Sequence, residues 1–165
     1  MRYSWIYTII AFSLILFVPG CFEPLETKQG LINADPWADP IWGSPVEGLQ
    51  CRLTSDRRTW KATDTPTFKF DLQNNGKRTF AFWPANKHQF CRIQVNGKWH
   101  RWSGGEMIDS QVWPLAPGAA YKGVTLELHK GYGIILKPGR HIIRAAFTLE
   151  DIKVASNPVG IEIRK

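Results

Sequence analysis

The chain has 165 residues and a formal net charge of +7, and 44% of its residues are hydrophobic. This length allows one domain plus a tether and excludes an array of several domains. The sequence contains no Gly-x-Ser-x-Gly elbow, no Walker loop and no dinucleotide-binding fingerprint. The motifs of the sequence therefore do not support assignment to the common hydrolase, NTPase or dehydrogenase classes.

The N-terminal segment predicts export. Residues 6–18 form an apolar run that is typical of a signal peptide and shorter than the roughly 20 residues of a membrane span. Gly20 precedes Cys21, as at a bacterial lipoprotein cleavage site, whereas Pro19 departs from that pattern. We predict a lipoprotein signal peptide over residues 1–20 and lipid attachment at Cys21, on the periplasmic or cell-surface side of a bacterial membrane. The alternative is an ordinary signal peptide or an uncleaved anchor.

Residues 21–47 have the composition of an acidic, proline-rich tether. They carry five acidic residues and one basic residue, a net charge of −4, together with four prolines. Such a segment is expected to be extended and locally stiffened. It contains the imperfect repeat Asp35-Pro36-Trp37 and Asp39-Pro40-Ile41-Trp42. The two tryptophans could form a docking peptide for a partner. In the interpretation we favour, Trp42 packs on the edge of the domain and covers that edge.

Residues 48–165 predict an all-β domain. Apolar and polar residues alternate in several short segments, which is the period of strands with one buried face. The expected inward set is Leu49, Cys51, Leu53, Phe68, Phe70, Leu72, Cys91, Ile93, Val95, Val124, Leu126, Leu128, Ile161 and Ile163. Asn96-Gly97 predicts a hairpin that pairs residues 90–95 with 98–103. About eight or nine short strands and no helical period indicate an antiparallel β-sandwich, preceded by a signal helix and an extended linker.

Large aromatic side chains are the expected centre of the core. The candidates are Phe68, Phe70, Phe80, Phe82, Trp99, Trp113 and Phe147. Burial of each contributes roughly 1.5–3 kcal/mol. The chain has eight tryptophans, and the alternative role for some of them is a carbohydrate platform or a hot spot for a partner.

Two cysteines remain once Cys21 carries lipid. Cys51 and Cys91 both occupy predicted inward positions, and an exported domain meets an oxidising compartment where disulfides persist. A Cys51–Cys91 bridge would close a loop of about 41 residues and stabilise the fold by roughly 4 kcal/mol. The alternative is two buried free thiols that never meet.

We predict no catalytic residue, no cofactor site and no metal site. The histidines His88, His100, His129 and His141 lack the spacing of metal ligands. The adjacent acids Glu150-Asp151 fit a solvated loop better than an acid–base pair. The basic residues are scattered along the strands, which argues against a nucleic-acid partner and leaves an anionic glycan or lipid surface as a minor hypothesis.

Several motifs resemble a known family. They are Trp42-Gly43-Ser44-Pro45-Val46, Phe68-Lys69-Phe70-Asp71-Leu72, Leu115-Ala116-Pro117-Gly118, Leu136-Lys137-Pro138-Gly139 and Ser156-Asn157-Pro158-Val159. In this order they resemble the uncharacterised immunoglobulin-like domains of bacterial secreted proteins and lipoproteins. The resemblance covers residues 42–165 and implies an immunoglobulin-like sandwich whose last strand is 159–164. The chain is also weakly similar to the intracellular proteinase inhibitor family of bacilli, another small β-sandwich.

The sequence as a whole predicts a non-enzymatic, lipid-anchored, immunoglobulin-like binding or accessory module of the bacterial cell envelope. Its partners would be the membrane, through the lipid on Cys21, and an envelope protein or glycan. The first alternative is an extracytoplasmic proteinase inhibitor that uses a loop such as 104–111 or 129–133. The second is a hydrolase with an unrecognised site.

Overall fold

The computed structural model describes residues 34–83, 87–105 and 111–165. The strands are β1 (Leu49–Ser55), β2 (Thr59–Lys61), β3 (Thr67–Asn74), β4 (Phe80–Phe82), β5 (Cys91–Val95), β6 (Lys98–Arg101), β7 (Trp113–Leu115), β8 (Ala120–Glu127), β9 (Gly139–Leu149), β10 (Ile152–Ala155) and β11 (Val159–Arg164). A short helical turn, α1 (Lys87–Phe90), precedes β5. The expected all-β class is confirmed. Five of the strands have only three or four residues. The strands outnumber the expected eight or nine because so short an alternation does not stand out in the sequence.

The signal peptide, Cys21 and the first part of the tether lie outside the described residues. Within the described ranges, no helix has the length and apolar character needed to cross a bilayer.

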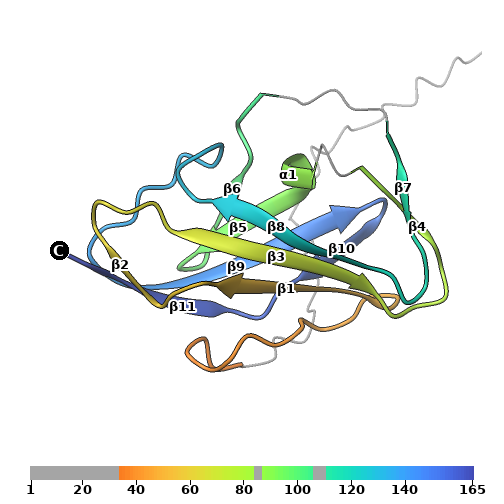
Figure 1. Cartoon of the computed structure of the whole chain (residues 1–165), viewed down its shortest axis with the longest axis horizontal. Coiled ribbons are helices and arrows are strands. Elements are labelled where there is room, and N and C mark those ends of the chain that lie inside the picture. Colours follow the sequence, from red (N-terminus) through yellow and green to blue (C-terminus); the bar gives the residue numbers. More distant parts are fainter. Residues whose placement is uncertain (1–33, 84–86, 106–110) are drawn as a thin grey trace, which may run out of the picture.

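Two sheets pack face to face, and Figure 1 looks onto the smaller one. The smaller sheet has the order β1-β3-β8, and the larger has the order β2-β11-β9-β5-β6, with β10 also pairing with β9. Strands β4 and β7 form a separate ribbon at one end of the sandwich (Figure 1). Strands β1, β3 and β8 take the places of A, B and E in an immunoglobulin domain, and β5, β9 and β11 take those of C, F and G. The predicted immunoglobulin-like sandwich is therefore the fold of this chain.

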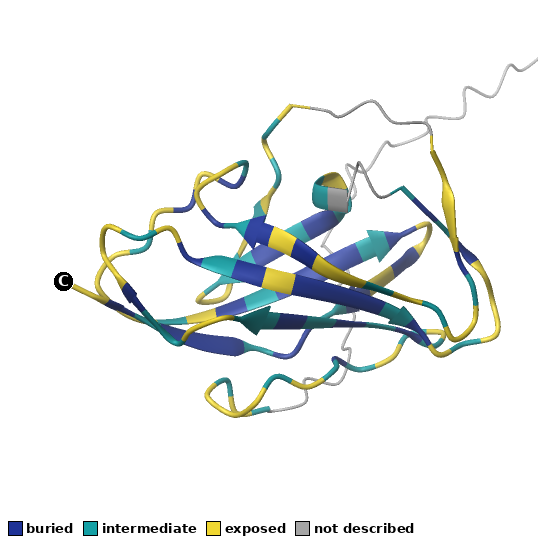
Figure 2. Cartoon of the chain, viewed as in Figure 1, coloured by how far each residue is buried: buried dark blue, intermediate teal, exposed yellow. Residues whose placement is uncertain are grey.

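The alternation of apolar residues identified the core of the sandwich. All of the expected inward residues are buried except Val95, which is partly buried against the core, and Figure 2 shows the alternation along the strands. Phe147 lies at the centre, with its ring 5.5 Å from that of Phe70 on the opposite sheet and 5.9 Å from that of Phe82. The inward faces of the two sheets thus meet through aromatic contacts.

The predicted hairpin is confirmed between β5 and β6. Asn96 and Gly97 have φ values of 48° and 87°, the positive φ that a two-residue turn of this type requires at both positions. The turn pairs Val95 with Lys98 and Gln94 with Trp99. This register decides which face of the sheet each residue of β6 occupies.

Two of the expected core aromatics are on the surface. Trp99 is 38% exposed and Trp113 is 46% exposed. The hairpin register pairs Trp99 with Gln94, whose neighbour Ile93 points inward, so the indole lies on the outer face. Trp113 pairs with Phe82 in the β4–β7 ribbon, where Phe82 takes the buried position. The prediction of core positions for Trp99 and Trp113 was wrong.

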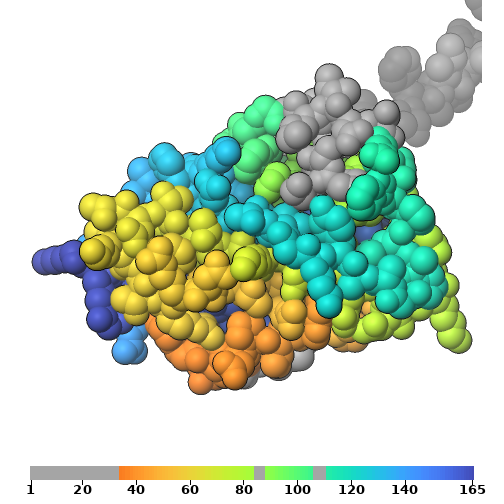
Figure 3. Space-filling model, viewed as in Figure 1, coloured from red at the N-terminus to blue at the C-terminus, as the bar shows by residue number. Residues whose placement is uncertain are grey.

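The second part of the predicted tether follows the surface of the sandwich, and we call residues 35–43 the strap (Figure 3, orange). The Arg58 guanidinium donates to the carbonyl oxygens of Pro36, Ala38 and Gly160. The amide of Gly160 donates to Pro36 at 2.6 Å. Trp37 lies against Gly160, because a Cβ atom at that glycine would come within 2.8 Å of the indole.

The strap ends at the edge of the domain beside β1. Gly43 donates to the carbonyl oxygen of Cys51 at 2.8 Å, and the Asn157 amide donates to that of Trp42 at 2.8 Å. The Arg52 guanidinium lies 4.7 Å from the Trp42 ring. The favoured interpretation of Trp42, as a residue that packs on the edge of the domain, is confirmed.

Candidate functional site: a basic face on the larger sheet

The outer face of the larger sheet carries an aligned group of polar residues that we call the basic face: Arg92, Gln94, Trp99, Arg101 and Arg144. Strands β5 and β9 bury Ile93 and Ala145, and since successive side chains point to opposite sides, the residues next to them point outward. The group therefore shares one side of three neighbouring strands, β9, β5 and β6.

The strand register arranges the basic face in two rows. Arg144 pairs with Gln94, which pairs in turn with Trp99. In the next row Ala146 pairs with Arg92, and Arg92 pairs with Arg101. Neighbouring strands lie about 4.8 Å apart, so each row spans roughly 10 Å. Three guanidinium groups and one indole thus occupy a compact area of the sheet.

The three arginines of this face have no acidic partner among the residues that the structure describes. Arg92 and Arg101 lie directly opposite each other, where like charges destabilise a sheet. Arg144 is half-buried, and burial lowers the pKa of its guanidinium, because desolvation disfavours the charged form. The sheet thus holds cations that nothing described within the chain neutralises. This arrangement is suited to binding an anion.

Trp99 adds an aromatic surface to these cations. The Lys153 Nζ, from β10, lies 5.4 Å from the centre of the Trp99 ring on β6. The two side chains therefore reach toward each other across β9 and β5. Ala146 is only 1% exposed although it points outward. The basic face thus presents charged, amide and aromatic groups side by side.

The outer face of the smaller sheet shows the contrasting arrangement. The Arg52 guanidinium donates to the Asp71 carboxylate at 2.7 Å, and the same carboxylate accepts the amide of Gly123 at 2.9 Å. Lys69 and Asp56 form an ion pair at 2.9 Å. These charges are satisfied within the chain, so this face offers less to an external ion.

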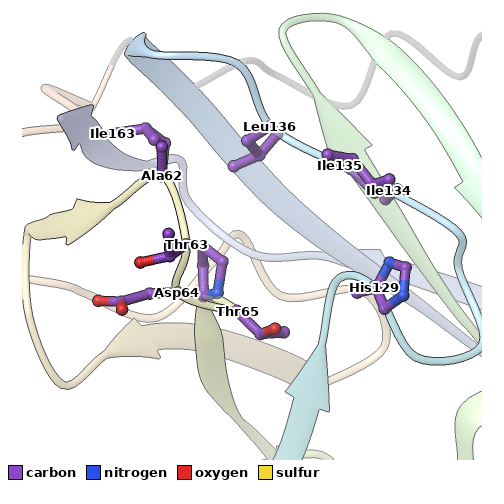
Figure 4. A pocket seen from close by; sticks show the side chains of 10 residues that line it. Ala62, Thr63, Asp64, Thr65, His129, Ile134, Ile135, Leu136 and Ile163 are labelled. Carbon is purple, nitrogen blue, oxygen red and sulfur yellow. The ribbon is translucent and has the colours of Figure 1, made fainter. Parts of the chain in front are cut away.

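A pocket of about 220 Å³ opens at one end of the sandwich (Figure 4). Asp64 and His129 contribute to its wall from different segments, and Figure 4 shows their side chains apart. The Asp64 carboxylate is already engaged, since it accepts the amide of Lys61 and lies 3.5 Å from Arg57. The pocket is smaller than the roughly 300–1,000 Å³ of most ligand sites. Its geometry gives no acid–base pair.

Cys51 and Cys91 are buried free thiols in this structure. Burial raises the pKa of Cys51 well above its ordinary value and that of Cys91 to about 12. Thiols that stay protonated at neutral pH are poor nucleophiles. The charge of Cys91 would further raise the pKa of Cys51, which places the two thiols within electrostatic reach of each other. The disulfide stays a prediction.

Two of the four histidines, His88 and His141, and the paired acids are engaged in local contacts. The His88 ring stacks on Trp102 with centroids 4.6 Å apart, and His141 Nε2 lies 2.8 Å from the carbonyl oxygen of Lys137. Glu150 and Asp151 both pair with Arg78 at the surface. No group of three His, Cys, Asp or Glu side chains in the described part of the chain is placed to hold a metal ion.

The two loops considered for a proteinase inhibitor differ in what the structure shows. Most of loop 104–111 lies outside the described residues. In loop 129–133, Tyr132 is buried and donates through its hydroxyl to the carbonyl oxygen of Cys91 at 3.4 Å. Gly131 lies under Trp102, because a Cβ atom there would come within 1.9 Å of the ring. The described loop is thus packed against the domain.

Two solved structures show a distant likeness to this chain. No family model matches the chain, and no curated protein matches it. A CARDB domain from Pyrococcus furiosus, solved in complex with di-metal ions, is 10% identical with a TM-score of 0.39, over 73% of this chain and 98% of that one. A β-glucosidase from Erythrobacter marinus is 17% identical with a TM-score of 0.38, over 76% of this chain and 15% of that one. Values this low carry no argument about function.

Proposed function

We propose that the chain is a non-enzymatic, lipid-anchored binding module of a bacterial cell envelope, and that the basic face is its binding surface. The signal segment and Cys21 support the anchor. The observation that supports a binding role is the group of three guanidiniums without acidic partners. Like charges on directly paired residues of a sheet do not stabilise the fold. A partner with negative charge would form ion pairs with them.

A pull-down tests the binding surface. Tagged full-length chain is solubilised from envelopes after cross-linking and compared with the triple variant R92Q/R101Q/R144Q. The matched control is K61Q/K77Q/K122Q, which removes the same charge from exposed lysines outside the basic face. We expect the wild type and the control to retain a partner that the triple variant loses. Equal retention by all three proteins would refute the proposed surface.

The mass of the mature N-terminus tests the anchor. We expect a chain that begins at a lipid-modified Cys21, and a Cys21→Ala variant that leaves the membrane fraction. An unmodified Cys21 or an intact Met1 would contradict lipid anchoring.

The proteinase-inhibitor alternative is tested by assaying the same preparation against a panel of proteases. We expect no inhibition.

A further inference from the structure

One row of the basic face carries two uncharged polar or aromatic side chains beside its arginine, and this narrows the class of ligand. In the row that crosses β9, β5 and β6, the amide of Gln94 and the indole of Trp99 follow the guanidinium of Arg144. The next row places Arg92 and Arg101 beside them. A surface that attracts only phosphate or sulfate has no need of an amide and an indole among its cations. Their position calls for a ligand with both acidic groups and a polar ring.

A sugar ring fits this combination. Its hydroxyl groups both donate and accept, as the Gln94 amide does. The Gln94 Nε2 already donates to the carbonyl oxygen of Gly97 at 3.1 Å. No donor among the described residues reaches its amide oxygen, which can accept from a hydroxyl. The apolar face of a pyranose ring packs against an indole, and Trp99 is 38% exposed.

The arginines fit carboxylates attached to such a ring. A guanidinium offers two parallel N–H groups that match the two oxygens of a carboxylate. Arg144 is half-buried and lacks an acidic partner among the described residues, so a bound carboxylate would supply the missing charge. Because each row crosses neighbouring strands, the rows suit a chain of sugars that runs across the strands.

We propose that the basic face binds a linear polysaccharide whose sugars carry carboxylates. This inference rests on the proposed function, since it names the partner of the same surface. Arg144 binds a carboxylate through two hydrogen bonds, and Trp99 packs on the face of a neighbouring sugar. Arg92 and Arg101 bind the carboxylate of the next unit.

Binding to polygalacturonate tests the proposal with the solubilised full-length chain. The control polymer is the same polysaccharide with its carboxyl groups reduced to alcohols. We expect R144Q to weaken binding by about 10- to 100-fold, because it removes a charge-assisted pair of hydrogen bonds. R144K should restore only part of the affinity, since an ammonium lacks the planar fork. W99A should weaken binding by about tenfold, and the reduced polymer should not bind.

Three further probes in the same buffer give the outcomes that would overturn the proposal. They are dextran sulfate, single-stranded DNA and vesicles with 30% phosphatidylglycerol (about the charge of a bacterial membrane). Equal or tighter binding to any of them, or W99A binding that equals the wild type, would refute a carboxylated glycan. Melting curves of each variant confirm that it is folded.

The failure of this inference can be told apart from the failure of the proposed function. If the triple variant R92Q/R101Q/R144Q loses the pull-down partner while polygalacturonate does not bind to the wild type, the glycan proposal is refuted and the proposed binding surface stands. If neither the partner nor the polymer depends on these arginines, both proposals are refuted.

Discussion

The outer face of the larger sheet has two halves that differ in what covers them. At the strand β11, Trp37 of the strap lies against Gly160, and Arg58 donates to three backbone carbonyls of the chain itself. Over β5 and β6, nothing described covers the sheet, and Arg92 and Arg101 face each other without acidic partners. Arginine thus stabilises the fold in one half, whereas the guanidinium groups in the other half remain available to a ligand.

The comparison separates structural arginines from arginines suited to binding. A guanidinium that donates hydrogen bonds to backbone carbonyl oxygens of the same chain contributes to the free energy of unfolding. A guanidinium opposite a like charge makes no such contribution. Changes to the two halves should therefore have different effects on stability and on binding.

High pH should destabilise both halves together, because they share one core. The pKa of Cys91 is raised to about 12 by burial, whereas an unfolded thiol titrates near 8.5. The contribution of the protonated Cys91 thiol to stability is therefore complete below about pH 8.5 and is lost as the pH rises toward 12, at about 1.4 kcal/mol per pH unit. Urea unfolding between pH 8 and 11 under reducing conditions measures this slope. A Cys91→Ala variant with the same slope as the wild type would contradict the assignment.

Arg58→Met should loosen the strap. It removes three hydrogen bonds to carbonyl oxygens and should lower the free energy of unfolding by about 2 kcal/mol. Hydrogen exchange of the Gly160 amide, which donates to Pro36, should accelerate. Binding through the basic face should not change. A stability loss below about 0.5 kcal/mol would mean that the strap contributes little.

Gly160→Ala should have a smaller effect in the same half. The added methyl group would meet the Trp37 indole at 2.8 Å, so the strap must shift, at a cost of about 1 kcal/mol. Limited proteolysis should then cut within residues 35–43 sooner than in the wild type. An unchanged cleavage rate would show that Trp37 is not held against Gly160.

Arg92→Gln should have the smallest effect on stability and the opposite sign. It removes the like charge opposite Arg101 and should raise the free energy of unfolding by a few tenths of a kcal/mol (about 0.2–1). Thermal melting of this variant beside Arg58→Met compares the two halves directly. A loss of more than about 1 kcal/mol would mean that Arg92 is structural.

Local sequence patterns predicted the sandwich because most of its strands are half-buried. Alternation placed Ile93 inward, and Asn96-Gly97 fixed the hairpin. The same hairpin also determines that Trp99 shares a face with Gln94, so the outward position of Trp99 could have been found from the turn. The mistake was to treat a large aromatic residue as core without following the register.

The basic face could not be found in this way. It depends on the pairing of β5 with β9, which brings Gln94 opposite Arg144 from 50 residues away. In the sequence these arginines are scattered bases. Apart from the packing of Trp42, the strap was missed for a related reason, since a segment without alternation gives no sign of the contacts that Arg58 and Asn157 make with it.

The strap also has a mechanical consequence. Its hydrogen bonds to the domain follow one another along residues 35–43, so a pull from the N-terminal side would break them one after another instead of loading them all at once. Nine residues would release about 30 Å of extended chain before any force reached the paired strands β1 and β3. Under load, the strap would therefore extend before the strands of the core separate.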